Sequence, residues 1–371
     1  MRIFSVVGAR PQFVKLAPLH KAITVRHQHV IVHTGQHYDY QMSQSFFEEL
    51  SIPDPDYNLG VGSGRQGAQT GKMMEVLEKV FMKDRPDVVV VYGDTNSTLA
   101  GALVAAKMGL PIAHVEAGLR SYRRGMPEEL NRVVTDHLSS LLLCPSPPSV
   151  RNLAKEGITE GVAVVGDVMT ECLLSIEGSL DDTTPERFGV KKGEYVLATI
   201  HRQENADSEE NMREIIGAMR EYDGDVVLPL HPRTAKNIAV WGLMEKLTGS
   251  GNVKVLEPLD FLSFTAMERH AKKIMTDSGG VQKEAYFWGV PCVTVRDETE
   301  WTETLEGGWN VLTGADRARL LKALALPAPH SERAVVYGDS QVSARIVAEI
   351  EAMMLKSPHP HHGQAGSPTL S

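Results

Sequence analysis

A chain of 371 residues is long enough for two domains, each with its own hydrophobic core. Its 42% hydrophobic and 23% charged residues are typical of a globular protein, and its formal net charge of −9 argues against broad nucleic-acid binding. The sequence contains no apolar run that approaches the roughly 18 to 20 residues needed to span a membrane.

The three cysteines, Cys144, Cys172 and Cys292, lie far apart and lack the spacing of a metal-binding motif. The chain enters an apolar strand at Arg2, without the charged and apolar regions of a secretory signal peptide. Isolated cysteines are typical of a reducing compartment. We therefore expect a cytoplasmic protein that holds no metal, does not enter the membrane and does not bind nucleic acid.

The first half of the chain alternates short apolar runs with helical patterns. The expected strands are Arg2–Val7, His29–His33, Val88–Val91 and Pro111–Val115, and the expected helices are Phe13–Val25, a helix that ends at Leu50, Gln69–Lys83 and Thr98–Met108. The strands show no hairpin signal between them. This alternation predicts a doubly wound α/β domain with a parallel sheet, which reaches about Cys144.

The junction between the first strand and the first helix indicates an anion site. Gly8 permits a tight turn with close backbone approach, and Arg10 and Lys15 lie in or near the first helical turn. Cations at a helix N-terminus are unfavourable unless an anion binds there, because the helix dipole attracts negative charge. We expect phosphate or another anion at this junction, with two solvated surface charges as the alternative.

Acidic residues follow two apolar runs of this domain. Asp94 comes after Val88–Val91, Glu116 comes after Pro111–Val115, and Glu128 follows a short loop. Ligands of parallel α/β sheets bind beyond the carboxyl ends of the strands, so these three carboxyl groups are expected to converge on one crevice. The alternative for each is a helix cap or a loop charge, although the Thr-Asn-Ser sequence after Asp94 already offers caps.

A second alternation follows a polar, proline-containing stretch, and we place the linker near residues 167–192. The expected strands are Tyr195–Ile200, Asp225–Leu230, Val253–Leu256, Lys273–Thr276 and Pro291–Val295, and the expected helices are Glu209–Glu221, Ala235–Leu247, Phe261–His270 and Val281–Trp288. An amphipathic helix is expected at Gln341–Leu355. Residues 356–371 lack a core-forming pattern and are expected to be disordered.

Two strands of the second half are followed directly by a histidine. His201 and His231 would thus lie at the crevice face of the sheet, where imidazole can donate to a phosphate or act as a general acid near neutral pH. The neighbours Arg202 and Glu204 favour a functional role for His201. For His231, a hydrogen bond to the backbone is an equally good interpretation.

A Ser-Gly-Gly turn, Ser278–Gly280, lies between a strand and the helix that begins at about Val281. Bare backbone N–H groups and the helix N-terminus form a cradle for phosphate oxygens. Glu284, in the first turn of that helix, is placed to accept hydrogen bonds from ribose hydroxyls. The sequence has neither the dinucleotide glycine fingerprint nor a P-loop, which argues against a nicotinamide enzyme or an ATPase.

Eight motifs, in order along the chain, carry a resemblance to a known family. They are GARPQFVK (8–15), VYGDTNSTLAG (91–101), HVEAGLRS (114–121), MPEELNR (126–132), HRQEN (201–205), LPLHPR (228–233), TDSGGVQKEA (276–285) and RDETEW (296–301). Together they resemble the non-hydrolysing UDP-N-acetylglucosamine 2-epimerases, from residue 2 to about residue 350. The number and order of the motifs make this resemblance highly specific.

The resemblance implies a GT-B-type fold, in which two Rossmann-like domains face each other across a central cleft. These are residues 1–167, joined by the C-terminal helix 341–355, and residues 168–340. It also implies a UDP-sugar substrate, a homodimer and no metal or nicotinamide cofactor.

Family roles carry over only to matching positions. The implied catalytic residues are Asp94, Glu116, Glu128 and His201. The implied substrate contacts are Arg10, Lys15, Phe264, Ser278, Gly279, Gly280, Glu284 and Arg296. An allosteric nucleotide-sugar site of bacterial members is matched at Gln36, His37, Arg65 and Gln66, whereas the adjoining Tyr38-Asp39 differs.

One departure from the family concerns the nucleotide. Many members have Glu-Arg-Pro-Glu where this chain has Glu300-Trp301-Thr302-Glu303, so one cationic ligand is missing from its usual position. Other segments, such as SGGVQKEA followed by EW, are more similar to relatives that act on UDP-2,3-diacetamido-2,3-dideoxy-glucuronic acid. An additional cation near the sugar, at Arg120, Arg123 or Arg124, would favour that acidic substrate.

The activity expected from the resemblance is interconversion of UDP-N-acetylglucosamine and UDP-N-acetylmannosamine, feeding surface-polysaccharide synthesis. UDP would be eliminated to leave a glycal and then added back. This scheme requires acid and base groups on the two faces of the sugar. It also requires hydrogen-bond donors that stabilise the departing diphosphate. The same chemistry on the diacetamido uronic acid sugar, and a glycosyltransferase of the same fold, remain alternatives.

Overall fold

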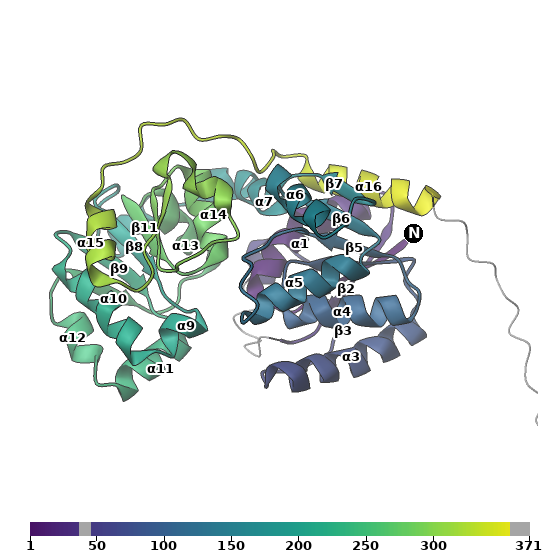
Figure 1. Cartoon of the computed structure of the whole chain (residues 1–371), viewed down its shortest axis with the longest axis horizontal. Coiled ribbons are helices and arrows are strands. Elements are labelled where there is room, and N and C mark those ends of the chain that lie inside the picture. The colour runs from purple at the N-terminus through teal and green to yellow at the C-terminus, as the bar shows by residue number, and fades with distance from the viewer. Residues whose placement is uncertain (37–45, 357–371) are drawn as a thin grey trace, which may run out of the picture.

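The structure is a computed structural model that describes residues 1–36 and 46–356. His37, most of the helix expected to end at Leu50, and nearly all of the expected C-terminal tail lie outside the described ranges. The described chain forms two lobes, each built on one parallel sheet with helices on both faces (Figure 1). This arrangement confirms the predicted α/β class with two Rossmann-like halves.

The first sheet has seven strands in the order β3-β2-β1-β4-β5-β6-β7. Its strands are β1 (Arg2–Val7), β2 (Gln28–His33), β3 (Tyr57–Asn58), β4 (Val88–Tyr92), β5 (Ile112–Val115), β6 (Leu141–Cys144) and β7 (Val162–Val164). The helices of this part of the chain are α1 (Arg10–Thr24), α3 (Gln66–Lys83), α4 (Asn96–Lys107), α5 (Pro127–Leu138), α6 (Pro147–Lys155) and α7 (Val168–Ile176).

The second sheet has six strands in the order β10-β9-β8-β11-β12-β13. They are β8 (Tyr195–Thr199), β9 (Asp225–Pro229), β10 (Val253–Leu256), β11 (Lys273–Thr276), β12 (Cys292–Thr294) and β13 (Asn310–Leu312). The helices are α8 (Thr184–Arg187), α9 (Gln203–Ala206), α10 (Glu209–Glu221), α11 (Pro232–Val240), α12 (Met244–Thr248), α13 (Phe261–Arg269), α14 (Gly279–Trp288), α15 (Arg317–Ala325) and α16 (Val342–Lys356), with 3-10 turns at Glu177–Ser179 and Thr302–Gly308.

The expected helix Ala235–Leu247 is wrong, because the structure has two shorter helices, α11 and α12, in this region. Between them Gly242 has a φ of 64°, a left-handed conformation that ends a helix. The predicted linker near residues 167–192 likewise contains a regular helix, α7. Its apolar side, which includes Cys172 and Leu173, packs in the same core as α1.

Strand β4 occupies the centre of the first sheet and is buried along its whole length. Such a continuous apolar run is typical of a parallel strand covered by helices on both faces. Helix α4 approaches it closely, since a Cβ on Gly101 would lie 3.1 Å from Val91 Cγ1. The small residues of α4 therefore let this helix pack closely on β1 and β4.

The chain returns to the first lobe at its C-terminal end (Figure 1). Helix α16 packs on α1, and its buried residues Val342, Ile346, Val347 and Ile350 join the same hydrophobic core as β4. His27, in the turn after α1, places its Nε2 2.8 Å from Glu351 Oε1 of α16. The domain limits at 167 and 340 remain predictions.

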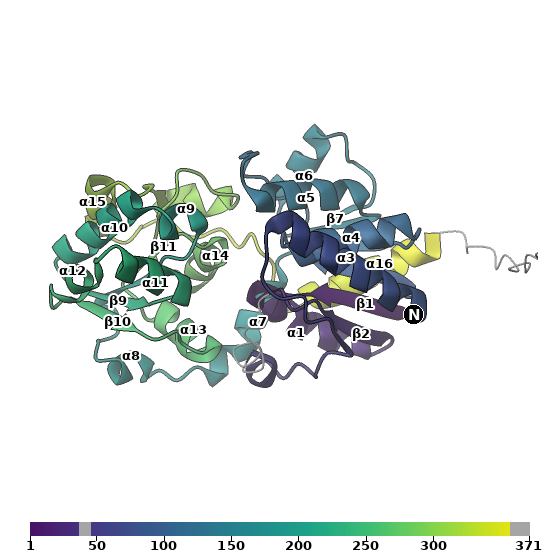
Figure 2. The same ribbon diagram turned by 90° about the horizontal axis from the view of Figure 1, so that it is seen from below.

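Both sheets have a topological switch point, where the chain reverses its direction of progress across the sheet. In the first sheet this point lies between β1 and β4, and in the second it lies between β8 and β11. Ligands of open α/β sheets bind at such points. The two lobes lie face to face in the view from below (Figure 2). None of the helices in the described ranges has both the length and the apolar character that crossing a membrane requires.

Candidate functional site

A cavity of about 450 Å³ lies between the two lobes, at their switch points. This volume is in the range of small-molecule sites. The first lobe contributes Lys15, Asp94, Glu116 and Glu128, and the second contributes His201, Ser278, Gly279 and Gly280. The three carboxyl groups thus face the Ser-Gly-Gly turn across one cavity, as the strand-end pattern predicts.

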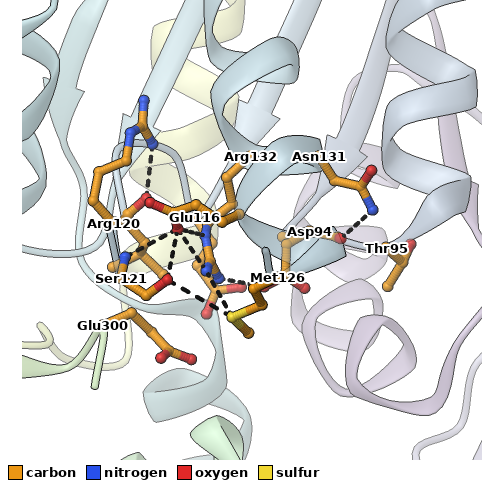
Figure 3. A network of polar contacts seen from close by, with 12 residues as sticks. Asp94, Thr95, Glu116, Arg120, Ser121, Met126, Asn131, Arg132 and Glu300 are labelled. Atoms are coloured by element: carbon orange, nitrogen blue, oxygen red, sulfur yellow. Dashed lines mark hydrogen bonds and ion pairs between the residues drawn. The ribbon is translucent and has the colours of Figure 1, made fainter. Parts of the chain in front are cut away.

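Asp94 lies between the end of β4 and the start of α4. Thr95, and not Asp94, caps the helix, because its hydroxyl accepts a hydrogen bond from Thr98 N at 3.3 Å. The Asp94 side chain is 30% exposed and pairs with Arg132 Nη1 at 2.5 Å. Asn131 Nδ2 holds the Asp94 carbonyl at 2.9 Å (Figure 3). Burial raises the pKa of Asp94, and the negative charge of Glu128 adds to this effect against the opposing effect of Arg132.

Arg132, on α5, is the cation that pairs with both Asp94 and Glu129, and the sequence analysis did not single it out. It is 1% exposed and also donates through Nη2 to Glu129 Oε2 at 2.9 Å. Glu129 in turn accepts hydrogen bonds from the backbone N–H of Ser121 and Tyr122, at 2.9 and 2.8 Å. Its neighbour Glu128 is the one that lines the cavity. An acidic residue three positions before an arginine on one helix is the signal that could have identified this pair.

Glu116 follows β5 in a left-handed conformation, with a φ of 71°, which is uncommon for a residue with a side chain and typical of functional sites. Its carboxylate pairs with Lys15 through one oxygen and with Lys283 through the other, at 2.7 Å for Lys283. Burial alone would raise the pKa of Glu116, but the two lysines lower it to about 2. Glu116 is therefore ionised at neutral pH.

Two glycines, Gly93 and Gly279, leave room for the side chains of Glu116 and Glu300. A Cβ on Gly93 would come within 3.0 Å of Glu116 Oε2, and the residue has a φ of 60°. A Cβ on Gly279 would lie 2.5 Å from Glu300 Oε1 and 3.2 Å from Trp301 Nε1. Only glycine fits at these positions without displacing charged or aromatic side chains.

The Ser278–Gly280 turn of the second lobe, predicted to bind phosphate, follows the buried Asp277. Its carboxylate accepts hydrogen bonds from the backbone N–H of His201 at 3.1 Å and of Arg202 at 3.0 Å. This ties the loop after β8 to the start of α14. The His201 ring remains exposed at the cavity, with its centroid 6.1 Å from that of His231. The turn residues Ser278, Gly279 and Gly280 line the same cavity, and the first N–H groups of a helix have no partner within it.

Four of the implied substrate contacts do not line the cavity. The Arg10 guanidinium lies 5.8 Å from the Phe46 ring, and Phe264 packs on the core of the second lobe. Arg296 is 4% exposed and pairs with Glu300 at 2.9 Å. The fourth, Glu284, is buried close to Glu268, and burial raises the pKa of both carboxyl groups.

The matched allosteric residues lie partly in the same cavity. Gln36 and Gln66 line it, and their side-chain oxygens accept hydrogen bonds from Ser97 N at 3.0 Å and from Asn96 Nδ2 at 2.6 Å. Arg65 is exposed at the start of α3. His37 is outside the described residues. A regulatory role for these positions remains a prediction.

The three arginines considered as sugar cations do not line the cavity. Arg120 is bound at 2.7 Å by both Asp136 and Glu156. Arg123 pairs with Glu204 and Glu298 at the surface, and Arg124 is exposed. Within residues 1–36 and 46–356, no group of three or more His, Cys, Asp or Glu side chains is arranged to hold a metal ion.

Comparisons with known proteins identify relatives that cover nearly the whole chain. The family model for UDP-N-acetylglucosamine 2-epimerase matches residues 21–351. A UDP-N-acetylglucosamine 2-epimerase homolog of Methanococcus maripaludis is 48% identical, over 94% of this chain and 98% of its own. A UDP-2,3-diacetamido-2,3-dideoxy-D-glucuronate 2-epimerase of Pseudomonas aeruginosa is 44% identical, over 93% and 98%.

A solved structure supports the same relationship. The Methanocaldococcus jannaschii UDP-GlcNAc 2-epimerase, in complex with UDP-GlcNAc and UDP, superimposes with a TM-score of 0.89. Its sequence identity to this chain is 42%, over 95% of this chain and 100% of the other.

Proposed function

We propose that this chain, which belongs to the UDP-N-acetylglucosamine 2-epimerase family, interconverts UDP-N-acetylglucosamine and UDP-N-acetylmannosamine. The observation that carries the proposal is the shared cavity, in which the Asp94, Glu116 and Glu128 carboxyl groups face the Ser278–Gly280 turn. Such a site can hold a diphosphate against one wall and the sugar against the other.

The chemistry avoids a free carbanion at C2, because that C–H group is not acidic enough to lose its proton on its own. A carboxylate removes the C2 proton while the C1–O bond breaks, and the C–H electron pair becomes the C1–C2 double bond of a glycal. The C1–O electron pair leaves with UDP. UDP then adds back to C1 as C2 receives a proton on its opposite face, which inverts that centre.

The environments of two carboxyl groups suit them to opposite roles. Glu116, whose pKa is lowered to about 2, is present as a carboxylate and can accept the C2 proton in one direction. Asp94, whose pKa is raised by burial, is better able to hold a proton and deliver it. Separated pKa values in one site are characteristic of acid–base pairs. Glu128 borders the same space and completes the acidic set.

Donors for the departing diphosphate come from both lobes. Lys15, the N-terminus of α14 and the His201 ring all border the cavity. Fixed donors of this kind stabilise the negative charge that develops on the leaving group. The paired state of Arg120 and Arg123 favours a neutral acetamido sugar over the uronic acid alternative, which would place another carboxylate in the site.

The experiment incubates the purified protein with each UDP-sugar separately in deuterated water and follows the anomeric signals by NMR. We expect UDP-N-acetylglucosamine to convert to its C2 epimer and to gain deuterium at C2. Conversion of only UDP-2,3-diacetamido-2,3-dideoxy-glucuronic acid would replace the proposed substrate by the acidic one. Absence of C2 labelling in both sugars would refute epimerisation and favour a glycosyltransferase.

We also propose that the enzyme works as a homodimer in the cytoplasm. Leu130 and Val134, one turn apart on α5, are 54% and 38% exposed and together form an apolar strip. The three buried, unpaired cysteines suit a reducing compartment. Light scattering should give twice the chain mass for the wild type and a lower mass for Leu130→Lys, whereas a monomeric wild type would refute the dimer.

A further inference from the structure

Lys283 connects the two lobes at the centre of the cavity. It lies on α14 of the second lobe, is 3% exposed and reaches two carboxylates of the first lobe. Its Nζ donates to Glu116 Oε1 at 2.7 Å and also to Asp167 Oδ2. Asp167 is itself fixed, because it caps α7 by accepting a hydrogen bond from Met169 N at 3.0 Å. Lys283 therefore neutralises a pair of buried carboxylates from the opposite side of the cleft.

Trp301 forms the support beneath this amine. Lys283 Nζ lies 4.0 Å from the centroid of the indole ring, within the range of a cation–π interaction. The indole is 3% exposed and packs in a cluster with Leu119, Tyr286 and Tyr337, so its position is fixed. Many family members have arginine at this position. In this chain the cation reaches the site from Lys283, and the residue at 301 supplies the aromatic surface that holds it.

Lys15 can interact either with Glu116 or with a diphosphate bound in the cavity. Its Nζ pairs with Glu116 Oε2, and its side chain also lines the cavity that contains the Ser278–Gly280 turn. A diphosphate with two negative charges would attract Lys15 more strongly than a single carboxylate does. If Lys15 moved to the diphosphate, Glu116 would keep a cationic partner only because Lys283 holds the other oxygen.

We propose that Lys283, supported by Trp301, is a positioning residue that keeps the Glu116 carboxylate ionised and in place while Lys15 moves to the diphosphate of the bound nucleotide. The inference rests on the proposed epimerase function. Lys283 would act through Glu116 and would not contact the substrate. Lys283 would also supply a cation next to position 301, where this chain has tryptophan and many family members have arginine.

The charges around Glu116 predict the direction of the effect on pH dependence. It faces Lys15 on α1, Lys283 on α14 and Asp94 after β4, while Asp167 and Glu284 lie close to the same lysines and Tyr337 lies nearby. Burial favours the protonated form of Glu116, and only the lysines bring its pKa down to about 2. Removal of Lys283 must therefore raise the pKa of Glu116 in the complex and shift the acid limb of turnover to higher pH.

The test measures kcat, KM and their pH profiles by NMR, and UDP affinity by calorimetry, for Lys283→Met and Lys283→Arg. Lys322→Met, an exposed lysine on α15, is the matched control. For Lys283→Met we expect kcat at pH 7 to fall by about 100-fold, because a shift of roughly 1 Å in the position of a catalytic carboxylate can cost that much. We also expect the acid limb of kcat to rise by roughly one pH unit or more, and the Kd for UDP to change by less than about threefold. Lys283→Arg should have a higher kcat than Lys283→Met and a smaller shift of the acid limb. Lys322→Met should match the wild type in kcat, pH profile and UDP affinity.

Trp301→Leu provides a second test that keeps the lysine. It should shift the acid limb in the same direction by a smaller amount, and it applies even if Lys283→Met does not fold. A loss of kcat with an unmoved acid limb in both variants would reduce Lys283 to a structural residue and overturn the proposal. A UDP affinity that falls more than about tenfold with an unchanged kcat would make Lys283 a direct ligand, which also overturns it. An inactive wild type would instead refute the proposed function, and the inference with it.

Discussion

At the scale of single residues, the site depends on carboxyl groups whose charge is set by nearby cations. Glu116 has two lysines, Asp94 has Arg132, and the buried Glu300 has Arg296 at 2.9 Å. Unpaired, such groups would be strongly destabilising inside a protein. Pairing lets the molecule keep the Glu116 and Glu300 carboxylates ionised at the cavity.

The first residue-scale prediction concerns the proposed acid–base pair. Asp94→Asn and Glu116→Gln keep the size of the side chain but cannot exchange a proton. We expect each variant to lose turnover by a few orders of magnitude and to retain UDP binding. Steady-state NMR kinetics and calorimetry measure the two quantities. Wild-type turnover in either variant would exclude that residue from proton transfer.

The second residue-scale prediction concerns the stability of the fold at acidic pH. Burial would raise the pKa of Glu300, but Arg296, Arg132 and Arg202 lower it from 4.5 to about 2. A carboxyl group with a lowered pKa in the folded state stabilises the fold above its unfolded pKa, and this contribution is lost as pH falls from about 4.5 to about 2. The pKa difference corresponds to roughly 3 kcal/mol.

Urea unfolding at pH 7, 4 and 3 should therefore show falling stability for the wild type. Glu300→Gln should be less stable at pH 7 and show a shallower decline, because the titrating group is gone. An identical slope in the variant and the wild type would show that Glu300 does not contribute to the acid sensitivity. Glu116, with the same direction of shift, would account for part of the remaining slope.

At the scale of elements, strand ends and helix starts create the two walls of the cavity. Asp94 and Glu116 follow β4 and β5, and the N-terminus of α14 carries the Ser278–Gly280 turn that we propose as the phosphate cradle. Parallel strands bring their carboxyl ends to one edge, and the first turn of a helix presents free N–H groups. The two kinds of end therefore supply complementary chemistry to one cavity.

The cradle predicts a specific effect of Gly279→Ala. The new methyl group would lie 2.5 Å from Glu300 Oε1 and must displace it or shift the helix start. We expect UDP affinity to fall by at least about tenfold, since the N–H groups would lose their alignment with the phosphates. Gly71→Ala, on α3 with nothing within 4 Å of its Cβ, is the matched control and should bind UDP normally. Equal UDP affinity in the two variants would contradict the assigned cradle.

At the scale of the whole molecule, the C-terminal helix α16 crosses back from the second lobe and packs on the first. Ile350 of α16 is fully buried in the first core, whereas Leu355 of the same helix is 88% exposed. The helix thus contributes to folding through one face only. It also fixes the end of the segment that crosses between the lobes (Figure 1).

We predict that Ile350→Ala lowers the free energy of unfolding by about 2 to 5 kcal/mol, because it removes buried contacts and leaves a cavity. Leu355→Ala should change it by less than about 0.5 kcal/mol, since that side chain is exposed. Urea titration of both variants measures the difference. Similar values for the two would show that α16 does not pack on the first lobe in solution.

The sequence by itself determined most of the strands, many of the helices, the α/β class and the convergence of Asp94, Glu116 and Glu128 on one crevice. These follow from local hydrophobic periodicity and from the rule that parallel strands end at one edge. The sequence did not predict β3, β6 or β13. The break between α11 and α12 was missed, because a glycine in a helical pattern does not by itself reveal a left-handed φ.

Only the tertiary structure decided which charges pair. Lys15 and Lys283 are separated by hundreds of positions, yet both reach Glu116, and Arg132 joins Asp94 from another helix. The order of the strands brings these side chains together, and that order depends on long-range packing, which no local pattern encodes. For the same reason, the sequence shows only that residue 301 is a tryptophan, whereas the position of Lys283 over its indole is evident only in three dimensions.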